Sequence, residues 1–197
     1  MKSLKSLEVL SRLSQKMIRI FSPEEFRRIF GVSLDAAQEF IKSHKADLFV
    51  KLRNGLYALR SNLPAEGEIA NRLYTPSYLS LEYALAHYRM IPEMVYSMTS
   101  VTTRTTRAFT AEGRSYEYSR IKRKAFTGYN NLKTDAGVIL IAEPEKALAD
   151  YLYFVDLKLK TLNERLFLNG KVNSKMVMRY LKLFGRKSLT DLAKKIL

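Results

Sequence analysis

Two basic residues and an amide surround a tight-turn sequence near residue 54. In the stretch KLRNGLYAL (residues 51–59), Asn-Gly separates two short runs of alternating apolar residues, a pattern typical of a β-hairpin with a two-residue turn. Lys51, Arg53 and Asn54 then lie at the hairpin tip, where cations and an amide can contact the phosphates of a nucleic acid. Pairing Arg53 with Leu56 across this turn predicts an apolar face made of Val50, Leu52, Tyr57 and Leu59. The opposite face would carry Phe49, Lys51, Arg53 and Arg60.

Two capped helices are expected immediately before this hairpin. Ser22, Pro23 and Glu25 form the pattern of a capping box with proline at the first helical position, and Gly31 suits the helix end. Ser33 can cap a second helix after a short Gly-Val-Ser turn. A further amphipathic helix precedes both, with an apolar stripe of Leu4, Leu7, Leu10, Leu13 and Met17. Helix-turn-helix followed by a hairpin is the order of a winged helix, and two core helices of an unrelated fold are the alternative.

A winged helix would contact DNA through residues of both helices and of the hairpin. Gln38 can read an adenine through two hydrogen bonds, whereas Ser33 at a helix N-terminus suits a phosphate. Asp35 and Glu39 on the same helix repel phosphates and argue against deep insertion into the groove. The predicted DNA contacts are Arg27, Arg28, Ser33, Gln38, Lys42, Lys45, Lys51, Arg53 and Asn54. The alternative for each is an ordinary solvated surface.

The composition is that of a basic protein without cysteine. The chain has 197 residues, with 34 Lys and Arg against 19 Asp and Glu, and the basic excess lies mainly toward the two ends. A net charge of +15 favours a polyanionic partner, first a nucleic acid and second an anionic membrane surface. The absence of cysteine excludes disulfides, thiol catalysis and thiolate metal sites. No signal peptide or membrane span is expected, so the sequence predicts a cytoplasmic protein. It also predicts no metal site and no cofactor.

A linker over residues 61–67 divides the chain into two predicted domains. Residues 1–62 would form the DNA-binding domain and residues 66–197 a second domain. The expected fold class is α+β, with an N-terminal winged helix-turn-helix followed by a mixed α/β domain and a helical C-terminal tail.

The second domain is expected to alternate helices with strands. Thr75-Pro76-Ser77 would start a helix that continues through Met90, and β character follows, including a hairpin around Glu112-Gly113. The apolar run at residues 137–142 predicts a strand buried on both faces, and residues 143–154 a helix with acids at its N-terminus. A basic helical tail would occupy the remainder, from residue 156.

Basic residues also cluster in the second domain. The clusters RTTR and RIKRK supply a predicted basic patch of Arg104, Arg107, Arg120, Lys122, Arg123 and Lys124. Tyr116, Tyr118 and Phe126 are interleaved with the second cluster, and aromatic and basic residues together hold single-stranded nucleic acid. The alternative, which we favour, is an alternating strand with its aromatic residues in the core.

One constellation could suit an enzyme. Asp135 before a buried strand, with Glu143, Glu145 and Lys146 after it, resembles the residue types of a metal-dependent nuclease, in which carboxylates and a lysine position a metal-bound water. The spacing departs from that pattern, because Glu145 and Lys146 are adjacent and would point to opposite faces of a strand. We therefore expect a helix start here and no enzyme activity.

Three stretches of the sequence, taken in order, carry a resemblance to a known family. The first is LRNGLYAL (residues 52–59), a basic hairpin with a Gly-Leu-Tyr centre, and the second is PSYLSLEYALAHY (residues 76–88). The third is IAEPEKALADYL (residues 141–152), with a Pro-Glu-Lys-Ala-Leu-x-Asp block. Together they resemble the AbiEi family of type IV toxin–antitoxin antitoxins, which are predicted transcriptional regulators of phage-defence operons. The resemblance covers residues 1–155, and the remainder is similar only as a helical tail.

The resemblance implies a repressor that binds inverted repeats of double-stranded DNA upstream of its own operon. It also implies a functional pairing with a nucleotidyltransferase-like toxin, which the second domain would counter without forming a stable complex. Composition and periodicity alone predict only a basic, two-domain protein with a DNA-binding domain. The alternatives are a nuclease or other nucleic-acid enzyme using the second domain, and a protein-binding adaptor.

Overall fold

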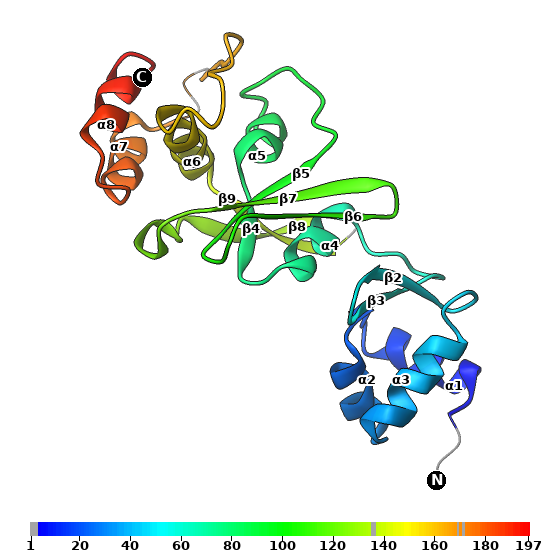
Figure 1. Cartoon of the computed structure of the whole chain (residues 1–197). Helices are drawn as coiled ribbons and strands as arrows, with labels where there is room; N and C mark the ends of the chain where they lie inside the picture. Colours follow the sequence, from blue (N-terminus) through cyan, green and yellow to red (C-terminus); the bar gives the residue numbers. More distant parts are fainter. Residues whose placement is uncertain (1–3, 135–136, 169, 171) are drawn as a thin grey trace.

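The computed structural model describes residues 4–134, 137–168, 170 and 172–197, and it is a mixed α+β structure (Figure 1). The first part of the chain forms three helices and a small antiparallel sheet in the order β1-β3-β2. Its elements are α1 (Ser6–Gln15), β1 (Ile20–Phe21), α2 (Pro23–Phe30), α3 (Leu34–Ser43), β2 (Phe49–Arg53) and β3 (Leu56–Leu59).

The rest of the chain forms a six-stranded mixed sheet in the order β6-β7-β5-β4-β9-β8, with helices on both faces. In Figure 1, α5 and α6 lie on one face of this sheet, whereas α4 and the small sheet lie on the other. The helices α7 and α8 pack on α6, at the end of the molecule far from α1. The elements are α4 (Glu66–Leu73), β4 (Ser77–Leu79), α5 (Leu81–His87), β5 (Met98–Thr102), β6 (Arg107–Ala111), β7 (Arg114–Arg120), the 3₁₀ turn η1 (Arg123–Ala125), β8 (Tyr129–Thr134), β9 (Gly137–Ala142), α6 (Pro144–Asp156), α7 (Ser174–Lys182) and α8 (Lys187–Lys194).

The caps expected for α2 and α3 are present. The Ser22 hydroxyl accepts a hydrogen bond from the backbone N–H of Glu25, and the Glu25 carboxylate accepts one from the backbone N–H of Ser22. Gly31 ends α2 in the left-handed region, with φ of 67°. Ser33 caps α3 by accepting from the N–H of Ala36. Local chemistry therefore sets both ends of the turn between α2 and α3.

The first part of the chain has its own small core, dominated by aromatic side chains. Phe21, Phe26, Phe30, Phe40 and Phe49 are all buried and contact one another. α1 covers this core through Val9 and Leu13. The predicted apolar stripe of α1 is wrong at two positions, because Leu7 is 83% exposed and Met17 is 87% exposed.

The hairpin has the predicted turn, but its faces differ from the prediction. Arg53 pairs with Leu56, as expected, and a bulge between Lys51 and Arg53 then shifts the register, so that Phe49 pairs with Leu59 and Val50 with Ala58. One extra residue in one strand exchanges the faces of everything beyond it. The face toward α1–α3 therefore carries Phe49, Tyr57 and Leu59, and the outer face carries Val50, Leu52, Leu56 and Ala58.

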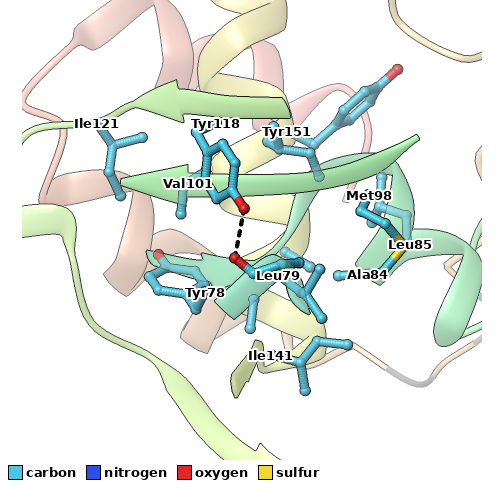
Figure 2. Packing of buried hydrophobic residues seen from close by; sticks show 14 of the residues in the cluster. Tyr78, Leu79, Ala84, Leu85, Met98, Val101, Tyr118, Ile121, Ile141 and Tyr151 are labelled. Carbon is cyan, nitrogen blue, oxygen red and sulfur yellow. Dashed lines mark hydrogen bonds between the residues drawn. The ribbon is translucent and has the colours of Figure 1, made fainter. Parts of the chain in front are cut away.

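The outer face of the hairpin belongs to the larger core of the molecule. Val50, Leu52, Leu56 and Ala58 are each 3% exposed or less, and with Ile20 they join the apolar cluster that continues through α4 and the six-stranded sheet. Figure 2 shows part of this cluster. The small sheet is thus covered on both faces, by its own helices and by the second part of the chain.

Polar contacts join the same two parts. Arg19 pairs with Glu68 of α4, and the Arg72 Nη2 atom of α4 lies 2.8 Å from each carboxylate oxygen of Glu25. Glu25 therefore both caps α2 and connects it to α4. Across all the residues that the structure describes, no helix is long and apolar enough to cross a lipid bilayer.

Three expectations for the second part are corrected. Residues 77–79 are not the start of a helix but form β4, which lies between β5 and β9 and is wholly buried, so that the helix α5 begins only at Leu81. The strand β9 is not buried on both faces throughout, because Val138 is 51% exposed. The tail is helical only in α7 and α8, and none of the described residues between α6 and α7 lies in a helix.

Candidate nucleic-acid interface

The helix α3 presents a polar face to solvent. Gln38 and Lys42 are exposed on it, Ser33 lies at its N-terminus, and Lys45 is exposed just beyond its end. The opposite side packs on the small core through Ala37, Phe40 and Ile41. The Ser33 hydroxyl oxygen is used by the cap, so a phosphate at this end would be bound mainly by backbone N–H groups.

Arg27 and Arg28 of α2 are engaged by an acid of their own helix. Glu24 accepts hydrogen bonds from the Nε and Nη2 atoms of Arg27, at 2.6 and 2.5 Å, and from Arg28 at 3.2 Å. The Arg27 hydrogen bond is the main reason that the pKa of Glu24 falls to about 2. These two arginines are therefore partly neutralised, which weakens them as contacts to DNA phosphates.

The hairpin tip is docked onto the second part of the chain. The Arg53 Nε donates to the carbonyl oxygen of Leu73, at the end of α4, over 2.7 Å, and its Nη1 donates to the carbonyl of Asn54 over 2.8 Å. Lys51 and Asn54 stay exposed. Arg53 thus holds the tip in place, while Lys51 and Asn54 remain available to a ligand.

Docking the tip creates a basic groove. The groove has a volume of 710 Å³ and runs between the hairpin and the segment that links β5 to β6. Lys51 and Arg53 line it from the hairpin, and Arg104 and Arg107 line it from the other side. None of these four side chains makes an ion pair among the described residues, and no carboxylate lines the groove. Unneutralised cations on facing walls suit a polyanion.

Two aromatic rings hold the arginines of this groove. The Arg104 guanidinium carbon lies 4.6 Å from the centre of the Tyr74 ring, and that of Arg107 lies 5.3 Å from the Phe109 ring. The Tyr74 hydroxyl is also 3.1 Å from the Thr105 Oγ1. Sequence reasoning missed Tyr74 and Phe109, because no local pattern shows that the end of α4 faces the start of β6.

The remaining predicted cations lie at the same end of the strands of the large sheet. β5 and β7 both terminate there, which places Arg120, Lys122 and Arg123 near Thr103 around a second hollow. Lys124 is exposed beside them but does not line that hollow. The predicted basic patch is therefore split between two sites that share no lining residue.

The interleaved tyrosines are core residues. Tyr116 and Tyr118 are each 1% exposed, and the Tyr118 hydroxyl donates to the carbonyl of Ala70 in α4. They cannot stack on bases, so the alternating-strand interpretation of β7 holds. Phe126 is half-buried and lines the second hollow.

The described residues proposed for a nuclease are each engaged by other partners. Asp135 lies outside the described residues. Glu143 accepts hydrogen bonds from Asn130 and Tyr180, whereas Glu145 accepts from the backbone N–H of Asn173. Lys146 is buried in α6, whose first helical residue is Pro144, as the helix-start interpretation expected. Within the described part of the chain, no group of three or more His, Cys, Asp or Glu residues could hold a metal.

Residues from two of the three stretches that resemble the AbiEi family meet in one buried hydrogen-bond network. Lys146 and Asp150, of the Pro-Glu-Lys-Ala-Leu-x-Asp block, pair with each other and are 0% exposed. Asp150 Oδ2 also accepts from the Tyr78 hydroxyl at 3.0 Å and from Ser80 at 2.9 Å, both of the Pro-Ser-Tyr stretch. Burial lowers the pKa of Lys146 and raises that of Asp150, because the loss of hydration outweighs their mutual attraction. Both stretches therefore join α6 to β4.

The comparisons with known proteins give no family. No protein-family model matches the chain, and a search of the curated proteins finds no match. The resemblance consequently rests on the three stretches of sequence.

Proposed function

We propose that the chain is a DNA-binding transcriptional repressor and antitoxin of a type IV toxin–antitoxin system, similar to the AbiEi family. In this proposal residues 1–62 act as a winged helix-turn-helix. The helix α3 would enter the major groove with Gln38 toward base edges, and Lys42 and Lys45 would contact the backbone. Two capped helices with an exposed polar face on the second one support this assignment.

The basic groove is the observation that carries the proposal. Its walls come from both parts of the chain, so a DNA backbone bound there would contact the hairpin and the second part together. Lys51 and Arg104 are exposed on opposite walls and make no ion pair among the described residues, so we assign them to phosphate contacts. Asp35 and Glu39 on α3 limit its contribution, so the groove would supply much of the affinity.

The antitoxin role rests on the resemblance alone. The protein would bind inverted repeats upstream of its own operon and repress it. Its second part would counter a nucleotidyltransferase-like toxin encoded by the neighbouring gene, without a stable complex.

Binding to the upstream region of the protein's own gene tests the proposal, with a mobility-shift assay first and then titrations over a range of salt concentrations. We expect Lys51→Ala and Arg104→Ala to weaken binding to all sequences and to reduce the magnitude of the salt slope by about one each. Gln38→Ala should relax the preference at a single base pair. The control is Lys133→Ala, an exposed lysine on β8, which is the outermost strand on the side of the sheet away from β6. Absence of a shift at low salt would contradict the proposal.

A further inference from the structure

The second hollow at the edge of the large sheet is a distinct cavity. It has a volume of 820 Å³, which lies within the range of small-molecule sites. It opens between the end of β7, the turn η1 and the side of α6. Its lining residue Thr103 precedes Arg104 of the basic groove in the sequence. The DNA-binding proposal does not use it.

The rim of this cavity is cationic. Arg120 and Arg123 are exposed there, and neither side chain makes a hydrogen bond or ion pair within the described part of the chain. Lys122 also lines the cavity, with its Nζ anchored at 2.6 Å to the carbonyl oxygen of Phe184. No carboxylate is among the lining residues. A rim of this kind suits several phosphate groups held close together.

Aromatic and apolar side chains also line the cavity. Among them are Phe126, Ile121 and Tyr153. Tyr153 is fixed by stacking on Phe184, with ring centres 4.2 Å apart. Its hydroxyl has no hydrogen-bond partner among the described residues, although Tyr hydroxyls usually find one when the ring is buried. Apolar lining residues beside a tyrosine that makes no hydrogen bond through its hydroxyl in the described chain suit a flat, hydrogen-bonding ring.

We propose that this cavity binds a phosphorylated nucleotide. The base would lie against Phe126 and Ile121 and accept or donate a hydrogen bond at Tyr153, and the phosphates would lie between Arg120 and Arg123. The nucleotide can be free in solution or the 5′-phosphorylated end of a single strand, since both present the same chemistry. The proposal is independent of DNA binding at the basic groove.

Calorimetric titration of the full chain, without DNA, tests the proposal. The probes are ATP, GTP, adenosine, inorganic tripolyphosphate and a 5′-phosphorylated single-stranded trinucleotide. We expect Arg123→Ala and Arg120→Ala each to weaken binding of the nucleotide by about tenfold or more, because each removes charge-assisted hydrogen bonds. Tyr153→Phe should change the preference among bases and leave the affinity for tripolyphosphate unaltered. Both arginines are exposed and unpaired in the described chain, so their replacement should spare the fold.

Lys124→Ala is the matched control, since it removes the same charge one residue from Arg123 but outside the cavity. Binding of ATP or GTP that Arg123→Ala weakens and Lys124→Ala spares supports a free nucleotide as ligand. Binding of the trinucleotide alone, with the same dependence on Arg123, supports a strand end. Equal losses in the Arg123 and Lys124 variants, tripolyphosphate binding as tight as that of the nucleotides, or no binding of any nucleotide at millimolar concentration would overturn the proposal.

Discussion

Among single residues, Lys146 and Asp150 form a fully buried ion pair. Replacing one partner of a fully buried pair leaves a charge or a polar cluster without its counterpart. We expect Lys146→Met to lower the free energy of unfolding by about 3–5 kcal/mol, measured by urea denaturation. The matched control is Lys194→Met, which removes the exposed pair with Asp191 and should cost about 1 kcal/mol or less.

A double variant distinguishes the stability that comes from the Lys146–Asp150 interaction from the stability that comes from the surrounding packing. Lys146→Met with Asp150→Leu removes both charges at once, so its loss of stability should be well below the sum of the two single losses. Tyr78 and Ser80 would then lose their acceptor, and some destabilisation should remain. Additive losses in the double variant would show that the two charges do not stabilise each other.

Among the elements, α2 is held at its N-terminus by Glu25, which caps the helix and connects it to α4. Burial raises the pKa of this carboxyl, but hydrogen bonds from Arg72 and Ser22 outweigh that effect and leave it below its usual value of 4.5. A carboxyl whose pKa is lower in the folded state stabilises the fold above its unfolded pKa, and this contribution is lost as the pH falls below about 4.5.

Thermal unfolding at two pH values checks this linkage. We expect Glu25→Gln to lower stability by about 1 kcal/mol at pH 7, since the pair with Arg72 is partly exposed, and the difference from the natural sequence should shrink toward pH 3. Glu39→Gln serves as control, because Glu39 is exposed on α3 and has no ion pair in the described chain. A difference that is the same at both pH values would mean that the ionised carboxylate contributes nothing.

Elements with strong local signals were predictable, and elements defined by their neighbours were not. The caps at Ser22 and Ser33 and the turn at Asn54-Gly55 follow from local chemistry, and the structure has all three. The bulge beside Leu52 and the strand β4 do not, because each depends on what packs against it. β4 has a helix-like sequence around it, and burial between two strands overrides that preference.

Over the whole molecule, the candidate site could be predicted only in part. The sequence identified the cations that line the groove, but it assigned Lys51 and Arg104 to separate patches. Their meeting depends on the outer face of the hairpin, whose apolar residues the predicted register had divided between the two faces. A one-residue shift in a strand thus decides whether the hairpin projects freely or packs on the second part of the chain.

This packing predicts how the molecule unfolds. Leu52 is 2% exposed in the cluster that spans the hairpin, α4 and the large sheet, so Leu52→Ala should cost about 2–5 kcal/mol. Because that cluster is continuous, we expect a single calorimetric transition, with equal calorimetric and van't Hoff enthalpies, whose midpoint falls in the variant. Leu13→Ala, in the small core of the first part, should lower the same midpoint. Two separate transitions, only one of which shifts in Leu52→Ala, would instead show that residues 1–62 unfold independently. The two walls of the groove could then move relative to each other.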